Sequence, residues 1–283
     1  GYKMGQTVRN KNLSHLFFVD DLKLYALDLV KMRKMLKTVA EFSEDVGMSF
    51  GISKCAYQCI VRGKRRIQNQ PLKVGELIIQ EIDEGDNYKY LGIDESVGIN
   101  GPLNKERVIK EYKSRVRKIW NSELNGYNKV IAHNSFAVPV LTPTIGILNW
   151  TKKEISDLDI ATRKILTMTG GFHTASDVDR IYVERKKGGR GLRSIEDMYE
   201  IRIVGITKHL EEMSEKHSIL REVGIHEKNK IGRLGDEFLK RRKDIQNSSN
   251  VKDGTRKEHE EKWKAKVTHG YFQKAIEEEK ENG

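Results

Sequence analysis

Two aspartates, Asp20 and Asp21, stand side by side near the start of the sequence, in the segment "HLFFVDDLKLYA". Asp favours turns because its side chain accepts hydrogen bonds from nearby backbone amides, and for the pair alone this explanation stands. The apolar flanks favour another, because carboxylates beside a core strand are costly unless a cation neutralises them. Mg²⁺ often takes one or two carboxylates together with substrate phosphates. The pair therefore predicts a Mg²⁺ site, with Mn²⁺ as the alternative ion.

The elements around the pair follow from the hydrophobic pattern. A β-hairpin is predicted over 13–25, with the aspartate pair at its tip. The apolar run "LSHLFFV" would form its first strand, and the run "LKLYA", which alternates apolar and polar residues, its second. Apolar residues at spacings of three and four predict an amphipathic helix over 29–46, which Gly47 ends. Short strands are then expected in four segments, "MSFGI", "AYQCIV", "ELIIQEI" and "YKYLGI".

Helices are expected to dominate the rest of the chain. A helix is predicted over 102–121, with an apolar face and a basic face. The apolar segment 130–150 predicts a buried helical hairpin that Pro139 and Pro143 interrupt.

Two further helices have capping signals at their first turns. Thr151 with Glu154 has the capping-box spacing, and Ser194 with Asp197 is expected to open the next helix. Beyond about residue 214 the sequence becomes charge-rich and sparsely apolar. That composition predicts solvated helices, a flexible stretch at 246–256 and a disordered end.

The chain has 283 residues and a net charge of +11, from 52 Lys and Arg residues against 41 Asp and Glu residues. This excess favours a polyanionic partner, either nucleic acid or an anionic membrane surface. The sequence has no run of about 18 apolar residues and no apolar signal-peptide core near its start. We therefore expect an intracellular protein, cytoplasmic or nuclear and not secreted, without a membrane partner and with Cys55 and Cys59 as reduced thiols.

Several motifs occur in the order in which a known family carries them. The hairpin "FVDD", flanked by "HLF" and "LKLYA", is followed by a helix, by "GMSFGISKCA" and by "YKYLGI". The helix "KEYKSRVRKIWNSELN", the apolar "AVPVLTPTIGILNW" and the turn "ERKKGGRGL" come next. This ordered set covers roughly residues 1–212. It resembles the C-terminal palm and thumb portion of the reverse transcriptases of LINE-type (non-LTR) retrotransposons.

The resemblance implies an α+β fold in three parts. Residues 1–101 would form a partial polymerase palm, with antiparallel strands and a helix behind them. Residues 102–212 would form a mainly helical thumb and connection, and residues 213–283 a charged tail that is helical or partly disordered. The implied activity is RNA-directed DNA polymerisation by two-metal nucleotidyl transfer. Its partners would be an RNA template, a DNA primer or hybrid duplex, and a dNTP.

The resemblance also implies roles for individual residues. Asp20 and Asp21 match the two adjacent aspartates at the catalytic Mg²⁺ ions. Lys54 matches a lysine that gives a proton or charge to the leaving pyrophosphate, although an ordinary exposed lysine explains it equally well. The remaining positions match residues that contact the primer: Phe18 and Val19 beneath its terminus, and Tyr90, Leu91 and Gly92 along its backbone.

Two basic clusters are predicted to contact nucleic acid, with a solubilising charged face as the alternative. The first lies on the thumb-like helix, and the second flanks a glycine turn that would allow close approach to a phosphate backbone. Their members are Arg115, Arg117 and Lys118, and Lys186, Lys187 and Arg190. Such binding should weaken steeply with salt and show little sequence preference.

Two departures from the family pattern bear on activity. Gly51 stands where the family usually has Asn, a few residues before Lys54. The family also needs a third carboxylate on an earlier palm strand, yet only 14 residues precede His15 and none is acidic. We therefore expect a palm and thumb portion without fingers and without the first catalytic Asp strand, inactive alone as a polymerase. The alternative is a non-catalytic basic module that binds RNA, DNA or a protein.

Overall fold

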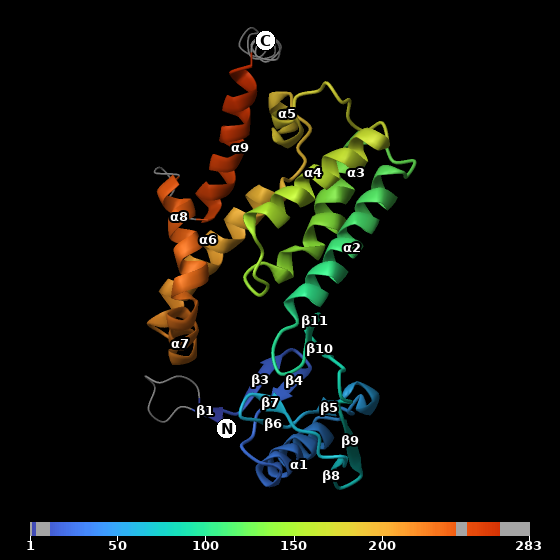
Figure 1. Ribbon diagram of the computed structural model, residues 1–283, viewed down its shortest axis with the longest axis vertical. Coiled ribbons are helices and arrows are strands. Elements are labelled where there is room, and N and C mark those ends of the chain that lie inside the picture. The colour runs from blue at the N-terminus through green and yellow to red at the C-terminus, as the bar shows by residue number, and fades with distance from the viewer. Residues whose placement is uncertain (1, 4–11, 242–247, 267–283) are drawn as a thin grey trace. The chain divides into compact units, whose positions relative to one another are not determined.

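The computed structural model describes residues 2–3, 12–241 and 248–266, which form an α+β structure of short strands and many helices (Figure 1). The chain divides into two compact units, residues 1–103 and residues 104–283. We call them unit 1 and unit 2 and describe each by itself. The strands of the described residues all lie in unit 1. None of the described helices has the length and the apolar character needed to cross a membrane.

The predicted hairpin over 13–25 is confirmed. β3 (His15–Phe18) and β4 (Asp21–Leu24) pair antiparallel, with Phe18 opposite Asp21. The aspartate pair is divided between two positions, because Asp20 lies in the two-residue loop while Asp21 begins β4. A shorter pair of strands, β1 (Tyr2–Lys3) and β2 (Asn12–Leu13), precedes the hairpin.

The predicted helix that follows is also confirmed, as α1 (Leu29–Asp45). Asp28 caps its first turn by accepting a hydrogen bond from the Lys31 amide at 2.8 Å. Gly47 leaves the helix in the left-handed conformation, with a φ of 68°. α1 packs on a three-stranded sheet in the order β5 (Ala56–Tyr57), β9 (Leu77–Glu81), β8 (Leu72–Val74). The core that they share is small and consists of Leu36, Tyr57, Leu72 and Ile79.

Three strand predictions in unit 1 need correction. "MSFGI" contains no strand, because its end enters a 3₁₀ turn, Ile52–Lys54, whose hydrogen bonds are local. "AYQCIV" divides into two strands with different partners: β5 pairs with β9, and β6 (Ile60–Val61) pairs with β7 (Lys64–Arg65). "YKYLGI" is a hairpin rather than a single strand, formed by β10 (Tyr88–Tyr90) and β11 (Ile93–Glu95).

Unit 2 is built around three long helices, α2 (Gly101–Trp120), α4 (Lys152–Met168) and α6 (Ile195–Ser214). α2 confirms the helix predicted over 102–121, and Val108, Tyr112 and Val116 are buried on one face as expected. Tyr112 reaches α4, where its hydroxyl lies 2.7 Å from the hydroxyl of Thr162 in the buried interface. α4 in turn packs against α6, so one apolar core joins the three helices.

The apolar segment 130–150 is largely buried, but it is not a helical hairpin. α3 (Gly126–Ala132) continues into a π-helical turn at His133–Ala137, and two 3₁₀ turns follow at Val138–Val140 and Thr142–Thr144. Each of the two prolines lies in the first turn of a 3₁₀ element, where the missing amide hydrogen leaves no bond unmade. The prolines therefore shorten the turns instead of separating two helices.

Both predicted capping signals in unit 2 are confirmed. Thr151 accepts a hydrogen bond from the Glu154 amide at 3.2 Å, and the Glu154 carboxylate accepts one from the Thr151 amide at 2.7 Å. Ser194 caps α6 by accepting from the Asp197 amide at 3.2 Å. The buried Asp159 on α4 accepts from the Ser194 hydroxyl at 2.8 Å. Burial raises the pKa of Asp159 to about 6, against the effect of its hydrogen bonds.

The charged C-terminal part is helical where the structure describes it, as its composition predicts. It contains α7 (Ser218–Glu227), a π-helical turn at Lys228–Gly232, α8 (Arg233–Arg241) and α9 (Ser248–Lys264). The predicted flexible stretch over 246–256 is wrong from residue 248 onward, because α9 begins there. Trp263 anchors this helix, since its side chain is buried and the Arg180 guanidinium lies 5.6 Å from its ring centre. Residues 246 and 247 and the predicted disordered end beyond residue 266 lie outside the described residues.

Candidate functional site

The tip of the β3–β4 hairpin has an unusual backbone. Val19 adopts the left-handed conformation with a φ of 57°, and its side chain is 80% exposed. Two-residue hairpin loops need a positive φ at their first position, which is why glycine or asparagine usually occupies it. A β-branched residue stores strain there, about 1–3 kcal/mol, and such strain persists mainly at functional sites. Phe18 is exposed as well. The tip therefore exposes two large apolar side chains next to the two aspartates in the sequence.

Both aspartates of the pair are exposed at this tip. Within the described residues, neither the Asp20 nor the Asp21 carboxylate forms an ion pair or a side-chain hydrogen bond. A turn aspartate of the ordinary kind would bond to a neighbouring backbone amide. The described part of the chain therefore leaves both carboxylates available to a cation.

Lys23 connects this hairpin to the β10–β11 hairpin. Asp21 and Lys23 are two positions apart on β4, so their side chains lie on the same face. The Lys23 ammonium lies 2.6 Å from the Glu95 carboxylate on β11 and 4.9 Å from the centre of the Tyr90 ring on β10. Burial raises the pKa of Tyr90; Lys23 opposes this effect, and the Asp21 carboxylate adds to it. The structure thus brings Tyr90 to the strand that carries Asp21.

The turn that contains Lys54 packs beside the same hairpin. The Tyr88 hydroxyl donates a hydrogen bond to the Lys54 carbonyl oxygen at 2.8 Å. Burial raises the pKa of Tyr88, with further contributions from Cys55 and Asp21. The Lys54 side chain itself is exposed. The backbone of this turn is therefore linked to β10 through Tyr88, while the action of the Lys54 ammonium on pyrophosphate stays a prediction.

Leu91 and Gly92 form the loop of the β10–β11 hairpin. Their φ angles of 47° and 82° give the two positive values that a two-residue loop of type I′ requires. Gly92 adopts this conformation at little cost, whereas Leu91 is strained and 45% exposed. Both hairpins of this site therefore present a large apolar residue in the left-handed conformation at the tip. Contact of this second tip with a primer stays a prediction.

The ligands at the Asp20–Asp21 tip suit Mg²⁺ in kind, but their number is low. Two carboxylates supply hard oxygen atoms, and Mg²⁺ commonly keeps its other positions for water and substrate oxygens. Across the residues that the structure describes, no group of three or more His, Cys, Asp or Glu side chains converges on one point. An ion held here would therefore need the phosphates of a bound substrate to complete its ligands.

Two residues of this site, Lys23 and Glu95, were missed by the sequence analysis. The alternation in "LKLYA" places Lys23 on the same face of the strand as Asp21. That spacing could have indicated Lys23 as a neighbour of the Asp21 carboxylate. Glu95 had no local signal, because it lies 72 positions from its partner.

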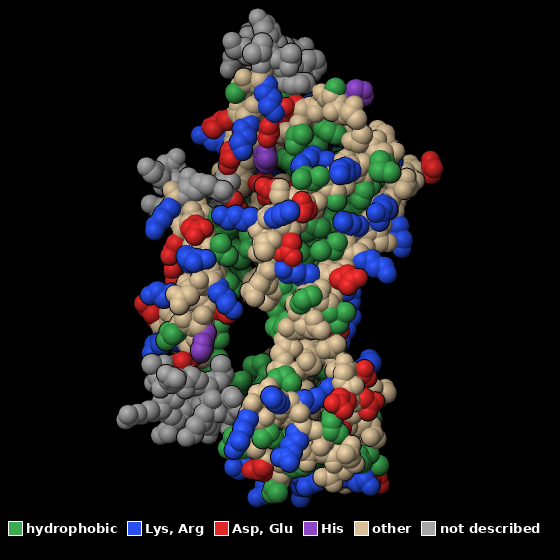
Figure 2. Space-filling view, in the orientation of Figure 1, with side chains coloured by type: hydrophobic (Ala, Val, Ile, Leu, Met, Phe, Trp, Pro, Cys, Tyr) green, Lys and Arg blue, Asp and Glu red, His purple; other side chains and the backbone are tan. Residues whose placement is uncertain are grey.

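Lys and Arg side chains are scattered over the visible face of the described residues rather than gathered in one cluster (Figure 2). Arg115 on α2 has a structural role that was not predicted, because it pairs with Glu111 at 2.6 Å and donates to the Phe136 carbonyl oxygen at 3.0 Å. Arg117 and Lys118 are exposed in the last turn of α2, where positive charge is favourable. These two residues remain suited to contact a phosphate backbone.

The glycine turn at 184–191 is packed against its own chain. A Cβ atom on Gly189 would lie 2.0 Å from the Val183 carbonyl oxygen, so no other residue fits there. Gly188 adopts a φ of 84°, which also favours glycine. The close approach that Gly189 allows is therefore made by the chain itself. Contact of this turn with a phosphate backbone stays a prediction.

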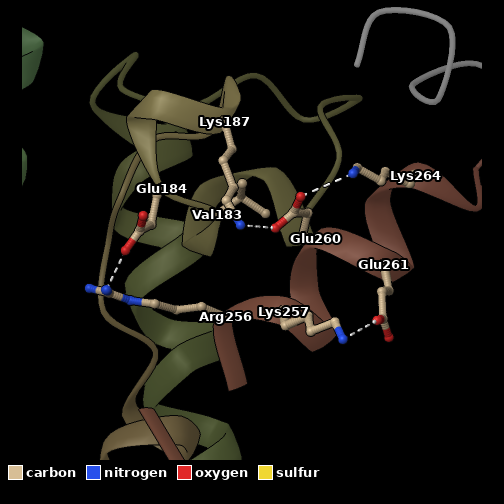
Figure 3. A pocket seen from close by; sticks show the side chains of 8 residues that line it. All are labelled: Val183, Glu184, Lys187, Arg256, Lys257, Glu260, Glu261 and Lys264. Carbon is tan, nitrogen blue, oxygen red and sulfur yellow. Dashed lines mark hydrogen bonds and ion pairs between the residues drawn. The ribbon is translucent and has the colours of Figure 1, made fainter. Parts of the chain in front are cut away.

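The basic side chains of this turn differ in their surroundings. Lys187 is engaged within the protein, because its ammonium lies 2.5 Å from the Glu260 carboxylate on α9. Lys186 and Arg190 are exposed. The Lys187–Glu260 pair and neighbouring ion pairs line a cavity (Figure 3). Its volume is about 410 Å³. Its lining consists of Val183, Glu184, Lys187, Arg256, Lys257, Glu260, Glu261 and Lys264. The mixed charge of this lining does not favour a phosphate.

No family model matches this chain, and no curated protein compared with it is significantly similar in sequence. The resemblance to reverse transcriptases therefore rests on the sequence motifs alone.

Proposed function

We propose that unit 1 is part of the palm of a LINE-type reverse transcriptase and that unit 2 contributes thumb and connection elements. One observation carries the proposal. The exposed aspartate pair sits at a strained hairpin tip, and Lys23 on the same strand reaches Glu95 and the Tyr90 ring of a second hairpin. Lys23 thus links the strand that begins at Asp21 to the hairpin whose exposed loop is Leu91–Gly92, and we propose that both hairpins contact the primer terminus.

In this function the chain's own residues bind and orient the substrates. Asp20 and Asp21 would hold Mg²⁺, or Mn²⁺ in its place, together with phosphate oxygens of the incoming dNTP. Such ions, when bound, activate the primer 3′-hydroxyl and offset the charge of the leaving pyrophosphate. The exposed ammonium of Lys54 would supply a proton or charge to that pyrophosphate.

The two hairpin tips would position the nucleic acid. Phe18 and Val19 would support the primer terminus from the first tip, and Tyr90, Leu91 and Gly92 would contact the primer backbone from the second. The exposed Arg117 and Lys118 of α2 would contact phosphates of the hybrid duplex between RNA template and DNA primer. The exposed apolar tips suit contact with the bases of a nucleic acid, and the nearby Lys and Arg side chains suit contact with its phosphates.

The chain alone is expected to give no measurable DNA synthesis. Two carboxylates supply less stabilisation of the transferring phosphoryl group than a complete metal site, and losing one such contributor costs on the order of a hundredfold or more in rate. A primer-extension assay on an RNA template, with Mg²⁺ or Mn²⁺, tests this expectation. Incorporation that disappears in the Asp20→Ala variant would contradict the expected inactivity.

Metal binding gives a test that does not need activity. Titration calorimetry with Mn²⁺ and a dNTP should detect binding to the wild-type chain and little or none to a variant carrying Asp20→Asn and Asp21→Asn. Asp83 and Glu84, two neighbouring exposed carboxylates in the same unit, provide the control. A variant carrying Asp83→Asn and Glu84→Gln should bind as the wild type does. Equal binding by all three proteins would rule out the proposed metal site.

The second candidate is a non-catalytic module that binds RNA or DNA through its basic surface. It is favoured by the low number of converging acidic ligands among the described residues and by the net charge of +11. Under this alternative, nucleic-acid binding would require neither Asp20 and Asp21 nor Mg²⁺, and added Mg²⁺ would weaken it as other salts do. Metal-dependent binding that requires the aspartates would favour the polymerase proposal.

A further inference from the structure

We propose that an exposed strip on α3 and the π-helical turn after it binds single-stranded nucleic acid by stacking on its bases. The strip consists of Tyr127, Ile131 and Phe136, and we call it the α3 strip. This inference rests on the nucleic-acid-binding part of the proposed function. It adds which residues bind and that the bound nucleic acid is single-stranded. It does not depend on the aspartate pair or on a metal ion.

The backbone of this segment separates a buried side from an exposed one. Val130, His133 and Ala137 are buried in unit 2. On the outer side, Tyr127 and Ile131 are four positions apart on α3, about one helical turn. Phe136 lies in the π-helical turn that follows, and it is exposed whereas His133 and Ala137 of the same turn are buried. The three exposed side chains therefore all lie away from the core.

The α3 strip exposes an unusual amount of apolar and aromatic surface. The side chains of Tyr127, Ile131 and Phe136 are 52%, 43% and 62% exposed. An isolated exposed apolar residue needs no explanation, but a row of them, two of which are aromatic, indicates a contact surface. π-helical turns are themselves frequent at functional sites.

Arginines border the α3 strip at both ends. The guanidinium of Arg185 lies 4.9 Å from the centre of the Tyr127 ring. Arg115 donates to the Phe136 carbonyl oxygen at 3.0 Å and is held by Glu111 at 2.6 Å. The Tyr127 ring thus has a guanidinium group beside it, and the backbone of Phe136 holds a second one. Rings that stack with bases and guanidinium groups that contact phosphates form the usual surface for single strands.

A hydrogen-bonded link fixes the basic loop after the glycine turn against the α3 strip. The Asn134 side chain donates to the Gly191 carbonyl oxygen at 2.9 Å and accepts from the Arg193 amide at 2.9 Å. The exposed Arg190 and Arg193 are therefore carried by a loop that is tied to the π-helical turn. Surfaces ordered before binding lose less entropy when a strand binds.

These features favour a single strand over other occupants. In a duplex the base faces are stacked on one another and cannot reach a protein ring, whereas an unpaired strand presents them. A negatively charged peptide would pair with the arginines but would leave the exposed rings without a matching group. We therefore assign single-stranded nucleic acid to the α3 strip.

The test measures anisotropy of labelled oligo(dT) in low salt with EDTA, which removes any metal contribution. Tyr127→Ala and Phe136→Ala should each weaken binding about tenfold, within the range of base stacking on aromatic residues. Tyr127→Trp should retain binding, because it keeps an aromatic face. Met168→Ala on α4, which removes a side chain that is 85% exposed, is the matched control and should bind as the wild type does.

Duplex DNA of the same length is the second probe and should lose little affinity in the same variants. If wild-type protein binds oligo(dT) and the two alanine variants bind equally well, the α3 strip is not the site, while nucleic-acid binding by the chain stands. An equal loss for single-stranded and duplex probes would overturn the stacking argument. If the wild type binds neither probe, both this inference and the nucleic-acid-binding part of the proposed function fail.

Discussion

Unit 1 and unit 2 differ most in the apolar surface that they bury. Among the described residues, the core of unit 2 is a cluster of 24 buried hydrophobic residues, whereas the cluster in unit 1 has four. Unit 1 exposes large apolar side chains instead, on the β3–β4 hairpin and on α1, with Phe17, Phe18, Val19 and Phe42 as examples. Units with small cores are marginally stable, so unit 1 should unfold under milder conditions than unit 2.

This difference separates two kinds of surface. The residues proposed to bind a metal and a primer lie in unit 1, which has the small core, on hairpin tips with strained loops. The α3 strip lies in unit 2, which has the large core, and the hydrogen bonds of Asn134 to Gly191 and Arg193 hold the segment in place. Strained loops persist only where surrounding interactions hold them. We therefore expect substrate binding to stabilise unit 1 more than unit 2.

The largest expected effect comes from a cavity in the core of unit 2. Ile203 on α6 is 2% exposed, and Ile203→Ala should lower the free energy of unfolding by about 3 kcal/mol. Tryptophan fluorescence during urea unfolding measures this, because Trp120, Trp150 and Trp263 all lie in unit 2. Leu36→Ala in unit 1 is the control and should leave the fluorescence transition unchanged. Equal shifts of the fluorescence transition in both variants would show that the units unfold together, which would contradict the expectation that unit 1 unfolds under milder conditions than unit 2.

A smaller and pH-dependent effect is expected at His259 on α9. Its ring nitrogens lie 2.9 Å from the Asp179 carboxylate on α5 (Asp179–Tyr182) and 3.1 Å from the Asp197 carboxylate on α6. Both nitrogens must donate, so the protonated ring is favoured. Burial lowers the pKa of His259, but the hydrogen bonds and charges of Asp197 and Asp179 together outweigh it and raise the pKa above 6.5.

The raised pKa fixes the sign of the pH dependence. The stability that His259 contributes is fully present below its unfolded pKa of about 6.5 and is lost as pH rises through the higher folded pKa. His259→Gln should therefore destabilise unit 2 by about 1–2 kcal/mol near pH 6 and by less near pH 9. Urea unfolding followed by tryptophan fluorescence at both pH values measures the difference. A loss that is the same at both would show that His259 is not charged in the folded state.

A stabilising change is expected at the first hairpin tip. Val19→Gly removes the side chain that conflicts with a φ of 57° and should stabilise the hairpin by about 1 kcal/mol, net of the added freedom of the unfolded chain. Amide hydrogen exchange of β3 and β4 measures the effect. Val30→Gly is the matched control, because Val30 is exposed on α1 and glycine there should destabilise the helix by about 1 kcal/mol. Faster exchange in the Val19 variant would contradict the strain at this tip.

The smallest effect is expected for the ion pair that links the two hairpins. Lys23 and Glu95 are partly buried, so a double-mutant cycle with Lys23→Met and Glu95→Gln should give a coupling free energy of about 0.5–1 kcal/mol. Hydrogen exchange of β4 and β11 gives the four values that the cycle needs. A coupling near zero would mean that the pair does not hold the hairpins together.

Local patterns predicted several elements of this chain correctly. The alternation around Asp20, the spacing of apolar residues in α1 and the capping box of Thr151 and Glu154 each depend on neighbours within a few positions. Such interactions are visible in the sequence because the side chains that make them are close along the chain. The same holds for the Ser194 cap of α6.

Features that depend on distant partners were not predicted. The first part of α9 forms where a flexible stretch was expected, because Trp263 and His259 of the same helix find partners on α5 and α6. Lys187 was expected to contact nucleic acid, yet its partner is Glu260, 73 positions away. The π-helical turn that contains Phe136 has no sequence signal of its own. At the aspartate pair, the sequence predicted the hairpin but not Lys23 and Glu95, which link it to Tyr90.

The central claim, that Asp20 and Asp21 bind a divalent cation at the hairpin tip, is tested most directly by Mn²⁺-induced relaxation in NMR spectra. Substoichiometric Mn²⁺ should broaden the amide signals of residues 18–22 and, more weakly, those of Tyr90 and its neighbours. The broadening should disappear in the variant carrying Asp20→Asn and Asp21→Asn. Broadening centred on Asp83 and Glu84 instead, or unchanged broadening at the tip of the variant, would contradict the claim.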